Sequence, residues 1–260
     1  MTDFFRSVWV IAYREFLRFI QDRPRMFSSF SMPLLFLVIF GAGFGQLIGQ
    51  MMPGVDYIQF MYPGILAMTV LMTSIMSGVS IVWDREFGFL KEVLVSPLNR
   101  SGVLVGKAIG AATIAIIQGA IMLVLAPILN VPIDLGTVLA LLPLLLILSL
   151  SLSGLGLLIG ARMRSQQGFQ ILMQLLIFPM MFLSGIFFPV SGVATWLEVL
   201  SKINPVTYGI DAIRQVFLGT EVAGVTVFGH TMGILESALV VAAVGVVLLA
   251  AAIWVFNRQE

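Results

Sequence analysis

Six long stretches of this chain contain no Asp, Glu, Lys or Arg, and this spacing of charges restricts the fold more than any other feature. The stretches are residues 26–55, 57–83, 108–133, 135–161, 165–197 and 237–257. Each is longer than the roughly 20 apolar residues that a helix needs to cross a bilayer. Because backbone polar groups inside a bilayer must be hydrogen-bonded within the protein, we expect each stretch to contain a membrane-spanning helix.

The composition supports this class of protein. Hydrophobic residues make up 59% and charged residues 10% of the 260 residues, whereas a soluble domain carries about 25% charged residues. The chain is also too hydrophobic to be disordered. Its net charge of +1 gives no support to nucleic-acid binding, and without cysteine it has no disulfide framework. We therefore expect an all-α polytopic membrane protein, with residues 1–260 in a single transmembrane domain.

Within this domain we place a six-span bundle over residues 26–256. The spans fall at about residues 26–49, 58–83, 103–129, 135–161, 166–188 and 233–256, and we number them one to six. If the N-terminus is cytoplasmic, the cytoplasmic segments hold twelve of the 14 basic residues, and only Lys202 and Arg214 lie outside. The positive-inside rule therefore predicts a multi-pass protein of the cytoplasmic membrane with both termini in the cytoplasm.

Two further segments predict helices at the membrane surface. In residues 1–25, apolar side chains recur at helical spacing, and Arg6, Arg14 and Arg18 fall mostly on the other side. This pattern is typical of an amphipathic interfacial helix with its Arg residues toward lipid headgroups. It would be either a simple anchor or an elbow that also contacts a cytoplasmic partner. Residues 186–230 are too polar to span and too apolar for water, which predicts short re-entrant helices in the outer leaflet.

Span two carries two stripes on neighbouring faces of a helix. They are Thr69, Thr73 and Ser77, and Met68, Met72 and Met76. One interpretation is packing and hydrogen bonding between helices. The other is the wall of a pathway for an amphiphilic cargo, because methionine adapts its shape to different ligands.

Small residues at four-residue spacing predict close helix packing at two other places. These are Gly102, Gly106 and Gly110 near the start of span three, and Ser149, Ser153, Gly156 and Gly160 in span four. The stretch from Gly102 to Lys107 also reads G-x-x-x-G-K, followed by Ala108. A phosphate-binding P-loop needs four residues between its glycines and Ser or Thr after the lysine. We therefore expect no ATP binding through this segment.

The largest cytoplasmic loop, residues 84–101, combines dense charge with an apolar stripe. Leu90, Val93 and Leu94 are apolar at i, i+3 and i+4, beside Lys91 and Glu92. A solvated loop is one interpretation, but an apolar stripe on a cytoplasmic helix favours docking into a partner groove. The span cores contain no ionisable residue of the kind that ion-coupled carriers use. We therefore expect energy to arrive from another protein, through this coupling helix.

These motifs resemble those of ABC-2 type ABC transporter permeases, and the resemblance covers essentially the whole chain. The cytoplasmic motif is carried by Asp84-Arg85-Glu86, Gly88, Glu92, Ser96-Pro97, Arg100 and Gly106-Lys107. The outer motif is similar to that of drug-export permeases, such as those for daunorubicin resistance, and of nodulation-factor exporters. It is carried by Phe182-Leu183-Ser184-Gly185, Phe187-Phe188-Pro189, Trp196-Leu197, Asn204-Pro205, Thr207-Tyr208, Asp211 and Arg214.

The resemblance implies the permease subunit of an ATP-driven exporter that moves amphiphilic drug-like, lipid-like or glycan substrates out across the membrane. Two copies of the permease would assemble with two separate ABC ATPase subunits. This chain would then not be an enzyme and would hold no cofactor or metal, while ATP and magnesium would bind in the partner.

The resemblance also implies roles for particular residues. Coupling to the ATPase would fall to Asp84, Arg85, Glu86, Gly88, Lys91, Glu92 and Arg100. The outer gate would be formed by Asn204, Pro205, Tyr208, Asp211 and Arg214. Spans two and five would line the pathway, with Thr69, Met72, Thr73, Met76, Ser77, Phe178 and Phe182 as candidate residues.

Two alternatives stay open on the sequence. A self-sufficient ion-coupled carrier or channel would need no ATPase, although the bare spans argue against it. The outer motif could serve as structural capping rather than as a gate, with Asn204-Pro205 as a turn and Asp211 paired to Arg214 at i, i+3.

Overall fold

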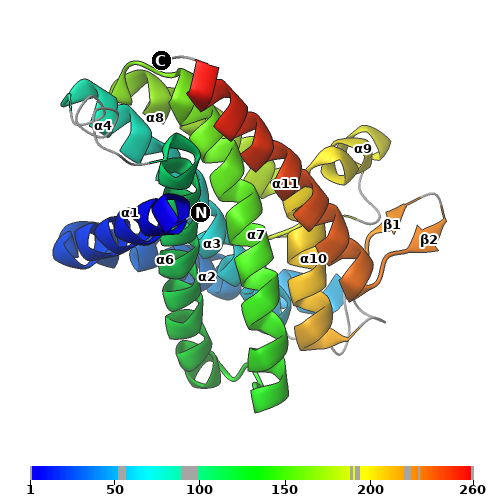
Figure 1. Cartoon of the computed structure of the whole chain (residues 1–260). Helices are drawn as coiled ribbons and strands as arrows, with labels where there is room; N and C mark the ends of the chain where they lie inside the picture. The colour runs from blue at the N-terminus through cyan, green and yellow to red at the C-terminus, as the bar shows by residue number, and fades with distance from the viewer. Residues whose placement is uncertain are drawn as a thin grey trace.

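The computed structural model describes residues 2–51, 57–88, 99–187, 190, 194–219, 224–227 and 229–258, and these form a bundle of helices (Figure 1). In chain order the helices are α1 (Thr2–Gln21), α2 (Arg23–Met51), α3 (Tyr57–Ile75), α4 (Val79–Glu86), α6 (Arg100–Leu125), α7 (Leu135–Arg162), α8 (Gln166–Leu183), α9 (Thr195–Ile203), α10 (Pro205–Leu218) and α11 (Ile234–Arg258). A 3₁₀ turn, η1 (Met76–Gly78), joins α3 to α4, and a second, η2 (Ala126–Leu129), follows α6. The short strands β1 (Thr226–Val227) and β2 (His230–Thr231) pair antiparallel, with Thr226 opposite Thr231.

Five helical segments of the described chain are long and apolar enough to cross a membrane. They are Tyr57–Glu86, Arg100–Leu129, Leu135–Arg162, Gln166–Leu183 and Ile234–Arg258, which correspond to predicted spans two to six. A sixth crossing results if α1 and α2, which are bent by 72° relative to each other, count as one broken span. The predicted all-α polytopic class is therefore confirmed, and predicted span one corresponds to α2.

Span two occupies the centre of the bundle. Its helix α3 is buried along most of its length and contacts α2, α6, α7 and α10. In Figure 1, α3 lies behind the long helices α6 and α7. A helix that is apolar on all sides is stable only when other helices or lipid surround it. This central position explains why the faces of span two differ little in hydrophobicity.

The small residues of α7 allow a close approach to span two. A Cβ atom at Gly156 would collide with the backbone carbonyl oxygen of Ile75, and one at Gly160 would collide with that of Gly78. One helical turn before Ser153, the hydroxyl oxygen of Ser149 lies 2.8 Å from that of Ser74. The predicted packing role of this face is confirmed, and its partners are the end of α3 and the 3₁₀ turn η1.

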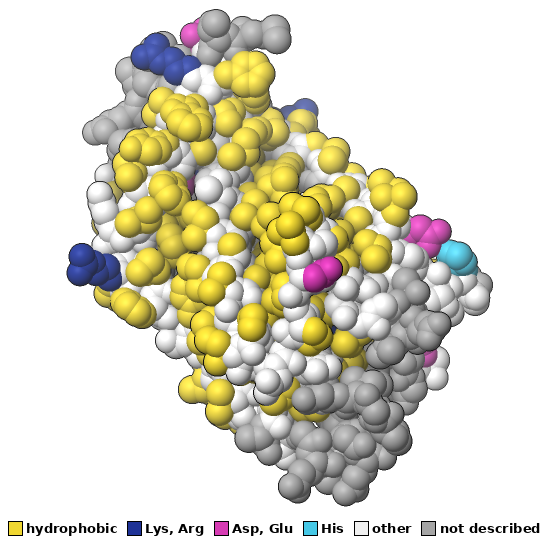
Figure 2. All heavy atoms as spheres, turned by 90° about the horizontal axis from the view of Figure 1, so that it is seen from below, with side chains coloured by type: hydrophobic (Ala, Val, Ile, Leu, Met, Phe, Trp, Pro, Cys, Tyr) yellow, Lys and Arg dark blue, Asp and Glu magenta, His cyan; other side chains and the backbone are white. Residues whose placement is uncertain are grey.

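The outer surface of the bundle is largely apolar. Figure 2 shows hydrophobic side chains spread over one face, with few and scattered charged side chains. Large exposed apolar side chains occur on several helices, among them Leu175 on α8 and Val246 and Trp254 on α11. Such a surface requires lipid or another subunit around it.

The predicted re-entrant segment, residues 186–230, contains the two short helices α9 and α10 and the strand β1. Helix α10 packs on α3 and α11 and is mostly buried, whereas α9 exposes Trp196, Val199 and Ile203. The β1–β2 hairpin was not predicted. The depth of these helices in the membrane and the division of the chain into the predicted subsegments stay predictions.

Candidate coupling site

The N-terminal helix α1 packs directly against the beginning of α6. The glycines of α6 make this approach possible, because a Cβ at Gly106 would lie 2.8 Å from the carbonyl oxygen of Val8. A Cβ at Gly110 would lie 2.9 Å from the Cβ of Glu15. The predicted close packing at this glycine stripe is confirmed, and its partner is α1.

Four charged side chains meet where α1, α4 and α6 converge. Lys107 Nζ lies 2.6 Å from Asp84 Oδ2 and 3.2 Å from Glu15 Oε1. Arg14 Nη2 lies 2.9 Å from each of the same two oxygen atoms. Lys107 also donates to the hydroxyl oxygen of Ser80 at 2.8 Å. We call Arg14, Glu15, Asp84 and Lys107 the charge network.

The charge network is electrically balanced, and it is buried at Asp84 and Lys107 and partly exposed at Arg14 and Glu15. Only 1% of Lys107 is exposed, and its three N–H groups have three acceptors. Burial by itself raises the pKa of Glu15, but Lys107 and Arg14 outweigh that effect and lower the pKa to about 2. Two positive charges face two carboxylates, which offsets the cost of removing these groups from water.

Arg85 fastens the end of span two to the end of span four. Its Nη1 donates to the carbonyl oxygen of Met163 at 2.5 Å, and its Nη2 donates to that of Ala161 at 2.9 Å. These carbonyls lie at the C-terminal end of α7, where unpaired carbonyl oxygens and the helix dipole favour a cation.

Glu86 makes the opposite contact with α8. Its Oε2 accepts a hydrogen bond from the backbone N–H of Gln166 at 3.4 Å, at the N-terminal end of α8, where helices favour an anion. Asp84, Arg85 and Glu86 thus contact three different places: the charge network, the end of α7 and the start of α8. We call these three residues the 84–86 clamp.

The other predicted coupling residues surround the segment that follows the clamp. Gly88 comes just after α4 with φ +80°, and Arg100 is exposed at the first residue of α6. Lys91 and Glu92 lie outside the described residues, as does the rest of 89–98, so the predicted coupling helix stays a prediction.

Asn99 fastens the far end of that segment. Its Oδ1 accepts a hydrogen bond from Gly102 N at 3.0 Å, and its own backbone N–H donates to Ser7 Oγ at 3.0 Å. Sequence reasoning missed Asn99, although an asparagine before a helical stretch is a common N-cap signal.

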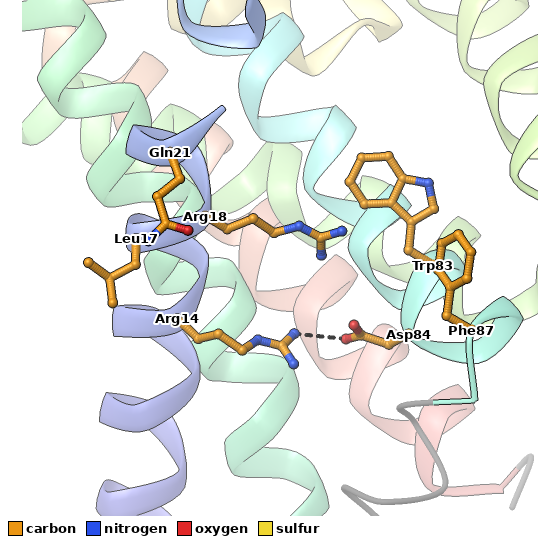
Figure 3. Close-up of a pocket in the computed structure, with 7 residues that line it drawn as sticks. All are labelled: Arg14, Leu17, Arg18, Gln21, Trp83, Asp84 and Phe87. Carbon is orange, nitrogen blue, oxygen red and sulfur yellow. Dashed lines mark hydrogen bonds and ion pairs between the residues drawn. The ribbon is translucent and has the colours of Figure 1, made fainter. Parts of the chain in front are cut away.

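Arg14, on the basic face of α1, turns inward, which differs from the prediction that the Arg residues of this helix face lipid headgroups. Arg14 contacts Asp84, and the guanidinium of Arg18 lies 4.4 Å from the ring centroid of Trp83 (Figure 3). The reason is that Asp84, buried at the end of span two, offers a carboxylate that a single-helix pattern cannot reveal.

The predicted gate residues at the other end of the molecule make capping contacts. Asn204 accepts from Val206 N at 3.1 Å, and its Nδ2 donates to the carbonyl oxygen of Met180 at 2.7 Å. Pro205 is the first residue of α10. The hydroxyl of Tyr208 donates to the carbonyl oxygen of Lys202 at 2.7 Å, near the end of α9. These contacts join α8, α9 and α10; a gating role stays a prediction.

The predicted i, i+3 pair between Asp211 and Arg214 is wrong as a direct contact. Asp211 accepts hydrogen bonds from Gln215 at 2.7 Å and from Ser237 at 3.3 Å. Arg214 donates to the carbonyl oxygen of Gly185 at 2.6 Å and lies over the ring of Phe60, 4.1 Å from its centroid. Each side chain finds a partner on another segment, so Arg214 ties α10 to the end of α8.

The predicted pathway residues of span two have different surroundings. Thr69 is 1% exposed and donates to the carbonyl oxygen of Ile65 in its own helix, which favours the packing interpretation for this residue. Thr73 donates to Gln118 at 2.5 Å, and Met72 is half-buried. Met76 and Ser77, with Thr73, line a cavity of about 20 Å³, which is room for about one water molecule.

The exposed face of α8 adds residues that the sequence analysis missed. Phe178 and Phe182, two of the predicted pathway residues, are exposed, and Gln170 and Gln174 are exposed on the same side of the helix. Glutamines at i and i+4 inside a charge-free stretch were the available signal. Whether these side chains line a pathway stays a prediction.

Among the described residues, no group of three or more His, Asp and Glu side chains is placed to hold a metal ion.

Comparison with known proteins gives the family. Residues 6–218 match the ABC-2 type transporter family, a range that includes the 84–86 clamp, α8 and α10. The chain belongs to this family. It is therefore a multi-pass membrane protein and the permease subunit of an ABC transporter, as the motifs led us to expect.

Individual relatives are similar over most of the chain. It is 28% identical over 224 residues to ycf38 of Cyanophora paradoxa, whose name describes a transport permease; the match covers 84% of this chain and 77% of that protein. It is 29% identical to nodulation protein J of Rhizobium leguminosarum bv. viciae over 195 residues, 74% of each chain. YbhR of Escherichia coli K12, whose name describes a multidrug ABC transporter permease, is 34% identical over 168 residues, covering 64% of this chain but only 45% of YbhR.

Proposed function

We propose that this permease exports an amphiphilic compound, driven by ATP hydrolysis in two separate ABC ATPase subunits, and that it works as a homodimer. The 84–86 clamp is the observation that carries the proposal. It joins the start of segment 89–98 to α1, α6, α7 and α8 through side-chain contacts of 2.5 to 3.4 Å. Movement imposed on that segment would therefore reach four helices together.

Within this proposal the coupling residues divide into two groups. Lys91 and Glu92 would meet the ATPase, in the segment that carries the apolar stripe. Asp84 and Arg85 are directed into the permease, so we assign them to transmission of the movement rather than to contact with the ATPase. ATP and magnesium would be bound by the ATPase subunits alone.

The exposed face of α8 supports the proposed pathway. Gln170 and Gln174 would lose hydrogen bonds if they faced lipid. A second copy of the permease placed against this face would enclose the two amides together with Phe178 and Phe182, and this mixture suits an amphiphilic substrate. The name of YbhR describes a multidrug permease, which agrees with such a substrate.

The proposal also assigns the two ends of the bundle. The clamp and both termini would lie on the cytoplasmic side of the cell membrane, because the clamp adjoins the segment that meets the ATPase. Asn204, Tyr208 and Arg214, which tie α10 to neighbouring segments, would close the pathway at the outer side.

Co-expression with a candidate ABC ATPase subunit tests the proposal. We expect the two proteins to purify as a complex, and we expect Glu92→Lys to reduce the amount of ATPase recovered at least severalfold. Glu198→Lys, on the proposed outer side, is the matched charge reversal and should leave the complex intact. Equal recovery with both variants would refute the assigned ATPase contact.

The charge network is the one observation that favours a self-sufficient ion-coupled carrier, since carriers of that class place ionisable groups inside the protein. The chain alone in proteoliposomes with an imposed proton gradient separates the two functions. The proposed exporter should show no gradient-driven uptake until ATPase and ATP are supplied, whereas a carrier would work without either.

A further inference from the structure

A hollow of about 450 Å³ lies between α1 and the end of α4, next to the charge network. Its lining residues are Arg14, Leu17, Arg18, Gln21, Trp83, Asp84 and Phe87. In Figure 3, Arg14 and Arg18 extend from α1 across the hollow toward Trp83 and Asp84. The coupling and pathway roles proposed above leave this hollow without a function.

The hollow carries one positive charge that no carboxylate of the described residues balances. Within the charge network, Arg14 and Lys107 offset Glu15 and Asp84. No carboxylate of the described residues lies within 4 Å of Arg18, whose guanidinium is held over the face of the Trp83 ring. A stacked guanidinium keeps its N–H groups at its edge, where they can donate to an anion.

The hollow also has an apolar rim. Leu17 is 37% and Phe87 76% exposed, while Gln21 adds an amide that can donate a hydrogen bond. A soluble anion would gain nothing from these apolar side chains. An anion attached to hydrocarbon chains would contact the guanidinium and the rim at once.

We propose that this hollow binds the phosphate of an anionic membrane phospholipid, with Arg18 as the main ligand and Gln21 as a further donor. The net charge of −1 on a lipid such as phosphatidylglycerol matches the single unbalanced positive charge, whereas the choline group of phosphatidylcholine would add a further positive charge. Asp84, which also lines the hollow, would not repel the phosphate strongly because Lys107 and Arg14 neutralise it. The inference rests on the cytoplasmic side that the proposed function assigns to the N-terminus and on the interfacial position predicted for α1 from the sequence.

Quenching of Trp83 fluorescence by brominated lipids tests the site in the full-length permease. Trp9, Trp196 and Trp254 are replaced by Phe so that Trp83 is the single tryptophan. The protein is reconstituted in vesicles of brominated phosphatidylcholine, or of phosphatidylcholine containing brominated phosphatidylglycerol. We expect the affinity for phosphatidylglycerol next to Trp83 to be about fivefold higher than that for phosphatidylcholine. This is the preference expected for one basic residue at a membrane surface.

Two charge-removing variants locate the preference. Arg18→Gln should abolish the preference for phosphatidylglycerol. Arg6→Gln removes the same charge from an exposed position on the same helix and should leave the preference within a factor of two of the parent protein.

Three results would overturn the proposal. Equal quenching by both lipids would remove the site but leave the proposed transport function untouched. No quenching by either lipid would show that α1 and Trp83 are away from the membrane interface, and the placement of α1 would fail with it. Loss of the preference on adding millimolar inorganic phosphate would identify a soluble-anion site instead of a lipid site.

Discussion

Lys107 is the side chain on which the contacts at the proposed cytoplasmic end depend most. It lies on α6, and its ammonium group reaches Glu15 on α1 and Asp84 on α4. Removing it would leave two buried carboxylates with only Arg14 between them. An uncompensated buried charge is far more costly than the loss of an exposed ion pair.

We expect Lys107→Met to lower the free energy of unfolding by about 3 to 5 kcal/mol, the range for breaking one side of a buried charge pair. Thermal unfolding of the purified permease in detergent measures this. The matched control is Lys202→Met, which removes a partly exposed i, i+4 contact with Glu198 and should cost less than about 1 kcal/mol.

A second substitution checks the cause. Adding Asp84→Asn to Lys107→Met restores charge balance, since Arg14 then faces only Glu15. We expect the double variant to be more stable than Lys107→Met alone. A double variant that is less stable would mean that shape, rather than charge, is what Lys107 supplies.

The sequence could not predict these partners. Lys107 attracted notice only in an incomplete P-loop pattern and in the cytoplasmic family motif, and Asp84 only as a predicted coupling residue of that motif. Glu15 and Lys107 are 92 positions apart. Periodicity describes one helix at a time, whereas this contact depends on how α1 turns relative to α2.

The sequence predicted that certain helix faces pack closely, but it did not predict which element each face contacts. The small-residue faces of spans three and four indicated close packing, and both faces are packed. Their partners, which are α1 for span three and the end of α3 with the 3₁₀ turn η1 for span four, could not be read from spacing. The turn does contain Ser77-Gly78, a dipeptide that favours turns, but this signal was passed over because it lies inside a continuous charge-free stretch.

Gly156 tests the contact between α7 and span two. In Gly156→Ala the new Cβ would collide with the carbonyl oxygen of Ile75, a backbone atom that cannot move without shifting a helix. We expect a loss of about 1 to 3 kcal/mol in unfolding free energy, as for other overpacked sites, measured by thermal unfolding in detergent.

Gly43→Ala is the matched control, because a Cβ at Gly43 on α2 would meet nothing within 4 Å. It should be neutral or stabilise the protein by up to about 1 kcal/mol, since alanine favours a helix over glycine. Similar losses for both substitutions would contradict the close approach at Gly156.

For the molecule as a whole, the charge-free stretches predicted the class and five spans directly. The sixth was less simple, since this end of the chain forms two helices, α1 and α2, that are bent by 72° relative to each other. The outer segment was predicted as helical, but its hairpin was not, because strands of two residues are too short to produce an alternating pattern.

Single cysteines test the proposed orientation, and the absence of native cysteine removes any background. In sealed right-side-out vesicles, we expect a membrane-impermeant maleimide to label Leu135→Cys, at the exposed first residue of α7. Arg164→Cys, between α7 and α8, should be labelled only after the vesicles are opened. The reverse pattern would invert the orientation and put the clamp on the wrong side for an ATPase.

The central proposal is that the 84–86 clamp transmits movement driven by an ATPase to the helices of the bundle. The direct measurement is transport per ATP hydrolysed by the reconstituted complex, for the parent protein, for Arg85→Gln and for the exposed control Arg162→Gln. We expect Arg85→Gln to assemble and hydrolyse ATP while its transport per ATP falls about tenfold, and the control to match the parent. Undiminished transport per ATP in Arg85→Gln, or transport by the permease without its ATPase, would contradict the account.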